Sequence, residues 1–124
     1  MIPIVTPQGQ PLNWNVNANS FGGTLVINQI DANDSSLQGV IFGDSIRGFW
    51  DEVAQKITFI RIPNNNDAAQ SQIYTAYLFQ NQNGPLDTIF TLAGYFEALS
   101  APAGGTAQRN LFGWFAQATI HIDV

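Results

Sequence analysis

Short apolar runs rich in β-branched and aromatic residues recur along this chain, and polar or glycine-containing turns separate them. Runs such as TLVINQI, KITFIRI and QIYTAYLF alternate with turn segments such as DANDSS and QNQNGPLD. Runs of this length and composition are typical of β-strands. A meander of strands in a chain of 124 residues usually has to close on itself, because open edges invite unwanted pairing. The sequence therefore predicts an all-β, antiparallel, up-and-down β-barrel of about eight strands.

The turn signals divide residues 1–124 into one barrel domain with an N-terminal extension. The expected strands are a segment at Trp14 and the runs 24–30, 37–42, 45–50, 56–62, 72–80, 88–99 and 111–123. Gly43-Asp44 is expected to be the two-residue link of a hairpin. Residues 1–11 contain Pro3, Pro7 and Pro11, which cannot donate to a strand ladder, so this segment is predicted to be an extended arm.

Composition excludes several classes of function. Charged residues make up only 10% of the chain, the formal net charge is −5, and there are four basic residues. Such a chain cannot form a basic stripe, so neither nucleic acid nor a membrane is an expected partner. There is no cysteine, which rules out disulfides, thiolate metal sites and thiol nucleophiles. With no signal-peptide pattern and no apolar stretch of membrane-spanning length, we expect a cytoplasmic protein.

The titratable residues give little support for catalysis or for a metal site. The one histidine, His121, shares a strand face with Asp123 at the C-terminal end, where a solvated histidine is the expected role. The turn at 31–36 lacks the spaced ligands and closing glutamate of a calcium loop. Glu97 either points outward or pairs, buried, with Arg47 or Arg61 as the polar floor of a cavity. We predict no catalytic residue, no metal and no cofactor.

The last two expected strands are apolar on more than one face. In 88–99, Phe90, Leu92 and Phe96 share one face, and Ile89, Ala93, Tyr95 and Leu99 share the other. A strand in an isolated barrel needs only one apolar face. The second face therefore favours a subunit interface in a homo-oligomer, although cover by the loop at 100–110 is an alternative.

Several motifs occur in the order found in the avidin and streptavidin family. They are WNVN at 14–17, LQGVIF at 37–42, ITFIR at 57–61, YTAY at 74–77, LAGYF at 92–96 and GWFA at 113–116. On these motifs the chain resembles that family over most of residues 12–124, and the resemblance implies an avidin-like, calycin-type barrel. It also implies that Trp114 is a lid offered to a neighbouring subunit. Val16 stands where the family has an asparagine, and Gly39-Val40-Ile41 lacks the family's ureido-binding tyrosine, so the implied pocket is rebuilt and does not bind biotin.

The sequence thus predicts a non-catalytic binder of a small, partly apolar ligand in the barrel mouth. The candidate ligand-binding residues are Trp14, Asn15, Asn17, Arg61, Tyr74, Tyr77, Tyr95 and Trp114. One alternative is a structural or interaction protein that has a solid barrel and acts through homo-oligomeric assembly. A second alternative is a barrel-type isomerase, which has only the barrel shape in its favour.

Overall fold

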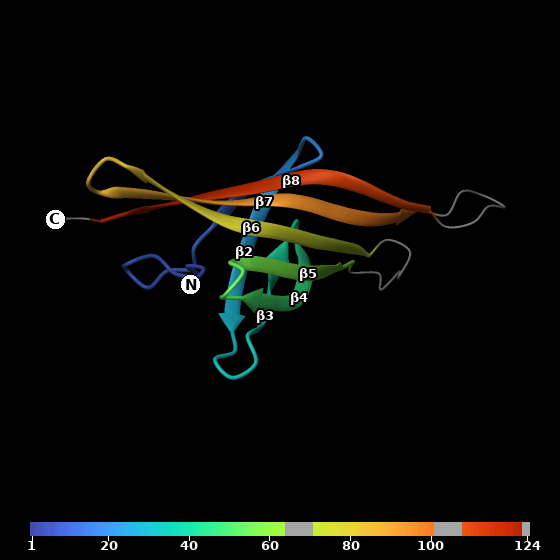
Figure 1. Cartoon of the computed structure of the whole chain (residues 1–124), viewed down its shortest axis with the longest axis horizontal. Helices are drawn as coiled ribbons and strands as arrows, with labels where there is room; N and C mark the ends of the chain where they lie inside the picture. The colour runs from blue at the N-terminus through green and yellow to red at the C-terminus, as the bar shows by residue number, and fades with distance from the viewer. Residues whose placement is uncertain (64–70, 101–107, 123–124) are drawn as a thin grey trace.

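The strands of this protein form one closed antiparallel barrel, in which each strand pairs with the next and β8 returns to β1 (Figure 1). The computed structural model describes residues 1–63, 71–100 and 108–122. The strands are β1 (Trp14–Ala18), β2 (Phe21–Ile30), β3 (Ser36–Ile41), β4 (Asp44–Asp51), β5 (Lys56–Ile62), β6 (Gln72–Asn83), β7 (Asp87–Ser100) and β8 (Gln108–His121). The predicted all-β, up-and-down barrel of eight strands is confirmed.

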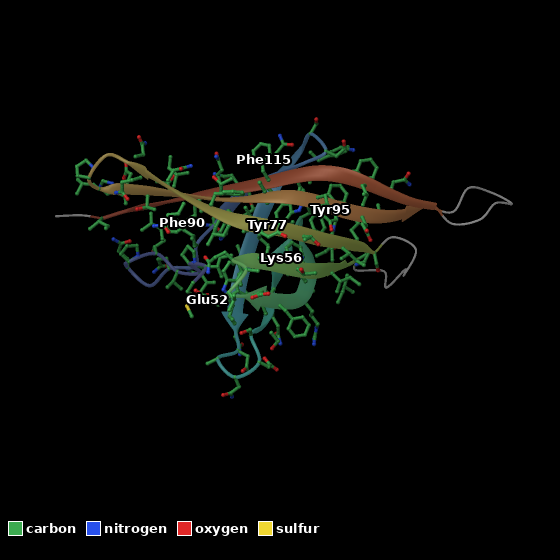
Figure 2. The ribbon with its side chains drawn as sticks, in the orientation of Figure 1. Glu52, Lys56, Tyr77, Phe90, Tyr95 and Phe115 are labelled. Atoms are coloured by element: carbon green, nitrogen blue, oxygen red, sulfur yellow. The ribbon has the colours of Figure 1, made fainter. Side chains whose placement is uncertain are left out.

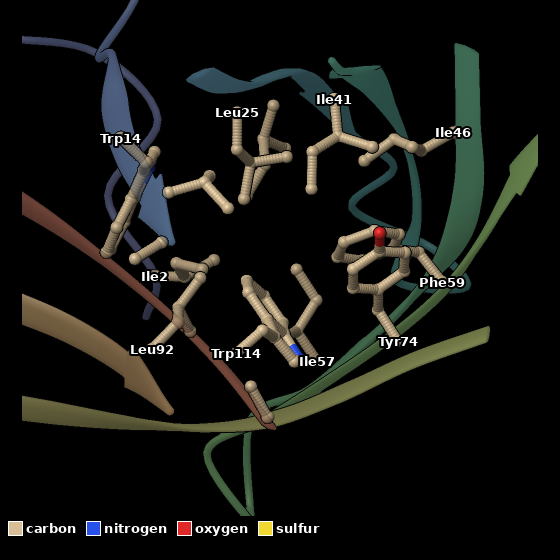
Figure 3. Packing of buried hydrophobic residues seen from close by; sticks show 14 of the residues in the cluster. Ile2, Trp14, Leu25, Ile41, Ile46, Ile57, Phe59, Tyr74, Leu92 and Trp114 are labelled. Carbon is tan, nitrogen blue, oxygen red and sulfur yellow. The ribbon is translucent and has the colours of Figure 1, made fainter. Parts of the chain in front are cut away.

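Alternate residues of each strand face the barrel interior, as the period of two requires. In β1, Trp14, Val16 and Ala18 are buried while the residues between them are exposed. Large apolar side chains from all eight strands meet in one core (Figure 3). The largest fully buried side chains are Trp14, Tyr74, Phe59, Ile2, Leu25, Ile27, Leu37, Ile41, Ile46, Ile57 and Leu92. The barrel is therefore packed with side chains through most of its length.

The N-terminal segment closes one end of the barrel. It folds back on itself through a bridge between Val5 and Pro11, with the Leu12 amide donating to the Ile4 carbonyl at 2.9 Å. Ile2 and Leu12 are buried in the core. The segment, predicted to be an extended arm, is thus bent into a loop because burying its apolar ends stabilises the folded-back form.

The hairpin between β3 and β4 turns one residue earlier than predicted. Phe42 and Gly43 are the two turn residues, with φ of 51° and 79°, and Ile41 pairs with Asp44. Positive φ at both positions is the requirement of a type I′ turn, which matches the twist of the flanking strands. The expected link at Gly43-Asp44 is therefore wrong by one residue. As a consequence Asp44 is the first residue of β4 and its side chain is buried.

The last three strands are the longest and extend past the rest of the barrel (Figure 1). β6 has 12 residues and β7 and β8 have 14 each, whereas β5 has only seven. β6 and β7 remain paired up to Asn83 and Asp87, well beyond Tyr77, where pairing with β5 ends.

Within the described residues there is no helix with the length and hydropathy of a membrane span.

Candidate functional site

The barrel end opposite the N-terminal loop holds a cavity of about 270 Å³, here called the mouth cavity. It lies where the β1–β2 and β3–β4 turns meet the end of β5 and the start of β6. Its lining residues are Ala18, Phe21, Gly22, Phe42, Arg61, Gln72, Tyr74 and Phe96. Half of these residues are aromatic and only a few are polar, which is the usual composition of a small-molecule site.

A chain of polar side chains crosses three strands at the wall of the mouth cavity. Arg61 on β5 donates from Nε to Asp44 Oδ2 on β4 at 2.8 Å, and its Nη2 forms an ion pair with the same oxygen, also at 2.8 Å. Its Nη1 donates to Gln72 Oε1 on β6 at 3.1 Å, and the Tyr74 hydroxyl donates to the same oxygen at 2.6 Å. Arg61 and Gln72 are direct cross-strand partners, so the barrel register itself brings these groups together.

Four aromatic rings from four neighbouring strands form a ladder beside this polar chain. Phe59 stacks on Tyr74 with ring centroids 4.9 Å apart (Figure 3). Tyr74 in turn stacks on Phe96, also at 4.9 Å. Phe96 stacks on Phe112 at 5.2 Å. Each stacked pair occupies directly opposed register positions, so the ladder follows one row of the sheet. These rings make a rigid apolar wall and hold Tyr74 in place.

Phe42 adds a second aromatic wall, and its backbone is strained. A bulky residue at φ 51° is uncommon and costs about 1–3 kcal/mol. The Phe42 ring lies under the Arg61 guanidinium, 5.1 Å from the ring centroid. It also lies so close to Gly23 that a β-carbon there would meet the ring at 2.3 Å. Strain of this kind is concentrated at functional sites, and here it fixes a ring against the charged group of the mouth cavity.

Burial alters the acidity of one group in this site. Desolvation raises the pKa of the Tyr74 phenol, and the hydrogen bond and charge of Arg61 lower it by a smaller amount. Tyr74 is therefore a neutral hydroxyl at physiological pH, and it acts as a donor to Gln72. The site thus presents fixed dipoles and one compensated ion pair.

The predicted ligand-binding residues occupy three different regions. The structure brings Arg61 and Tyr74 together at the mouth cavity. Trp14 and Trp114 lie in the barrel core, 0% and 3% exposed. The remaining four, Asn15, Asn17, Tyr77 and Tyr95, are on the outside of the barrel.

Trp114 is held in the core by polar as well as apolar contacts. Its Nε1 lies 3.0 Å from the Tyr95 carbonyl and 3.2 Å from the Thr75 carbonyl, so one N–H is shared between two acceptors. Its ring also meets Phe59 and Tyr74 edge to face. Trp14 differs, because its buried Nε1 has no hydrogen-bond partner among the described residues.

Sequence reasoning did not identify Asp44, Gln72 or Phe42 as site residues. Asp44 was placed in a turn, so its inward orientation was not foreseen, and the carboxylate that pairs with Arg61 is Asp44 and not Glu97. Gln72 carried a usable signal: it stands two residues before Tyr74 and therefore shares its face of the strand. The cross-strand register, which no local pattern encodes, was needed to place Gln72 opposite Arg61.

Comparison with known proteins does not add a relative from which function could be transferred. No family model, no curated protein and no solved structure matches this chain. What the mouth cavity does must therefore be argued from its own residues.

Large apolar side chains also gather on the outside of β5 to β8, a surface here called the outer apolar face. It is formed by Ile60, Ile73, Tyr77, Phe79, Tyr95, Leu111 and Phe115. Tyr77, Tyr95 and Phe115 are 48%, 45% and 46% exposed, and Figure 2 shows them on the adjacent strands β6, β7 and β8. The register makes the face continuous, since Tyr77 pairs with Ala93 and Ala93 with Phe115. This arrangement agrees with the apolar second face predicted for the late strands. The side chain of Leu99, which was predicted to share that face, lies outside the described part of the chain.

Groups that could support other chemistry lie away from the mouth cavity. His121 Nδ1 contacts the Asp87 carboxylate where β7 and β8 pair, at the end of the barrel closed by the N-terminal loop. Asp123, the predicted neighbour of His121, lies outside the described residues. Among the residues that the structure describes, no three histidine or carboxylate side chains are close enough together to hold a metal ion.

Proposed function

We propose that this protein binds a small, partly apolar molecule in the mouth cavity without transforming it. The observation that carries the proposal is the chain from Asp44 through Arg61 and Gln72 to Tyr74, which lies at the wall of an aromatic cavity. A few convergent polar groups among apolar walls, in the mouth of a barrel, are a habitual setting for ligand binding. An avidin-like relationship agrees with the barrel architecture, which streptavidin shares with lipocalins.

The composition of the lining favours binding over catalysis. Of the described residues that line the cavity, none is a carboxylic acid or a histidine. Asp44 is not among the lining residues, and the hydrogen bond and ion pair with Arg61 occupy its carboxylate, so it is not available as a base. The absence of cysteine also favours a reducing compartment such as the cytoplasm.

A fragment screen followed by ¹H–¹⁵N spectra tests this proposal. Hits are expected to shift the backbone resonances of Ala18, Gly22 and Phe96. In an Ala18→Trp variant the new ring should fill the cavity and abolish the shifts at Gly22 and Phe96, because the Ala18 side chain points into the barrel and lines the cavity. Gln38→Trp, on the exposed side of β3, is the matched control and should retain them. Hits that survive in folded Ala18→Trp would place binding elsewhere and contradict the proposal.

We also propose that the chain assembles with copies of itself through the outer apolar face. The face spans about seven residues along β6 and the four strands β5 to β8 across, or roughly 23 Å by 19 Å. That flat footprint of about 450 Å², to which the projecting side chains add further area, is a little over half of the ~800 Å² per partner of a standard interface. Two identical sheets have the same twist, so they can pack face to face with their strands nearly aligned. A second copy is therefore the occupant that best fits this surface.

A further inference from the structure

The charge balance at the mouth cavity indicates the class of molecule that it accepts, an inference that rests on the proposed binding function. Arg61 is the one charged residue among the described residues that line the cavity. Both of its contacts to Asp44 are 2.8 Å long, and the two side chains are only 24% and 13% exposed. The pair sums to zero charge, so a bound anion would lose its hydration without meeting an uncompensated cation.

The aromatic walls do not favour a cation either. Tyr74 lies between Phe59 and Phe96, and Phe96 lies between Tyr74 and Phe112, so the faces of both lining rings are covered. One face of Phe42 is covered by the Arg61 guanidinium. What Tyr74 and Phe96 offer to the cavity is their edges, which carry the positive part of the ring quadrupole. A cation needs a ring face, and Phe21 at the rim is 71% exposed to water, where such a contact is weak.

Arg61 and Gln72, at the wall of the mouth cavity, have more unused hydrogen-bond donors than unused acceptors. Gln72 Oε1 already accepts from Arg61 and from Tyr74, which uses both of its lone pairs. Arg61 has five N–H groups, of which three take part in the contacts within the described network. The remaining guanidinium N–H groups and the Gln72 amide nitrogen are donors. A ligand that completes the network must therefore bring acceptors.

We propose that the mouth cavity selects an uncharged ring compound with an acceptor oxygen, and rejects carboxylates and ammonium ions of the same shape. The apolar edges of Tyr74 and Phe96 contact the ring of the ligand, and Arg61 and Gln72 donate to its oxygen. The selectivity depends on Asp44, because this carboxylate removes the charge that would otherwise attract anions.

Three probes of nearly equal shape test the proposal: benzamide, benzoate and benzylammonium. Each is titrated into ¹⁵N-labelled full-length protein, and the shifts of Ala18, Gly22 and Phe96 give the dissociation constants. We expect benzamide to bind in the millimolar range and at least about tenfold more tightly than either ion. This comparison uses the unaltered protein, so it does not depend on whether any variant folds.

An Asp44→Asn variant tests the cause of the selectivity. It leaves the Arg61 charge uncompensated, so benzoate should gain about tenfold or more relative to benzamide. Asp31→Asn makes the same change in net charge at the other end of the barrel, where asparagine can still accept from the Asn33 and Asp34 amides, and it should leave the preference unchanged.

The outcomes separate this inference from the proposed function. If benzoate or benzylammonium binds at the mouth as well as benzamide does, the cavity binds ligands but the inferred class is wrong. If none of the three shifts the mouth resonances at about 10 mM, the binding function itself is contradicted. Retention of the benzamide preference in folded Asp44→Asn would overturn the role given to Asp44.

Discussion

Tyr74 combines two environments within one side chain: its ring is part of the aromatic ladder and its hydroxyl is part of the polar chain. Burial raises the pKa of its phenol above the ordinary tyrosine value of 10.0. Above about pH 10 the unfolded chain has lost this proton while the folded chain retains it, so the free energy of unfolding falls as pH rises through that range. Below about pH 10 the Tyr74 phenol is protonated in both the folded and the unfolded chain, so the free energy of unfolding does not change with pH through this group.

Urea melts at a series of pH values from neutral to alkaline measure this effect. Tyr74→Phe should flatten the decline of the unfolding free energy above about pH 10. Tyr77→Phe, which alters an exposed tyrosine on the same strand, should leave the decline in place. A Tyr74→Phe protein with the same alkaline slope as the parent would show that Tyr74 is not the group responsible.

Trp114 belongs to the core because it fills space and also satisfies its own N–H. Truncating it removes the ring contacts to Phe59 and Tyr74 and leaves a large void. Trp114→Ala should therefore lower the free energy of unfolding by about 3–5 kcal/mol. Denaturant melts at two protein concentrations check this, with Val53→Ala at a fully exposed site as the control. A loss that appears only at the higher concentration would assign Trp114 to the association of subunits, the lid role that the avidin resemblance implied.

At the scale of strands, the close approach of a neighbouring strand's backbone explains why certain glycines lie in mid-strand. A β-carbon at Gly94 on β7 would meet the Thr75 carbonyl oxygen at 2.0 Å and Ala76 Cα at 2.8 Å, both backbone atoms that cannot move aside. Gly48 on β4 is similarly close to β5, with the Thr58 carbonyl oxygen at 2.0 Å. These contacts are produced by the coiling that closes a small barrel.

Gly94→Ala and Gly113→Ala form a matched pair that tests this explanation. The two glycines lie at adjacent register positions of β7 and β8, where Gly94 pairs with Trp114 and Gly113 with Tyr95, but a β-carbon at Gly113 meets nothing within 4 Å. We expect Gly94→Ala to cost about 1–3 kcal/mol of unfolding free energy. Gly113→Ala should be neutral or stabilising by a few tenths of a kcal/mol, because alanine restricts the unfolded chain. Equal effects in urea melts would contradict the close approach at Gly94.

The strands could be read from the sequence because each carries its own local pattern, whereas the site could not. The alternation of β8, with Trp114 and Ala116 inward, follows from the period of two alone. The mouth cavity instead depends on which residues of different strands stand opposite each other. A turn shifted by a single residue at Phe42 decides that Asp44 faces Arg61, and nothing local signals that a phenylalanine will adopt a positive φ.

For the whole molecule, the outer apolar face predicts self-association. Tyr95 is near the centre of that face, beside the buried Thr75 that is its partner on β6. Tyr95→Lys would bury an unpaired charge at the interface, which is costly by several kcal/mol, so the assembly should dissociate. Light scattering at tens of micromolar should give a multiple of the 13.5 kDa chain mass for the parent and a single chain for the variant.

Gln38→Lys is the control for this prediction, since it adds the same charge to an exposed position on β3, away from the outer apolar face. It should remain assembled. A parent protein that is monomeric under these conditions would refute assembly through this face while leaving the mouth cavity unaffected.

The central claim is that the mouth cavity holds a small uncharged molecule, and native mass spectrometry of freshly purified protein tests it most directly. We expect assembled chains that carry a small-molecule adduct, which is released on collisional activation and is neutral when recovered. The adduct should be missing from folded Ala18→Trp, in which the new ring occupies the cavity, and present in Gln38→Trp. A bare chain mass in the parent, or an adduct retained equally in Ala18→Trp, would contradict binding in the mouth cavity.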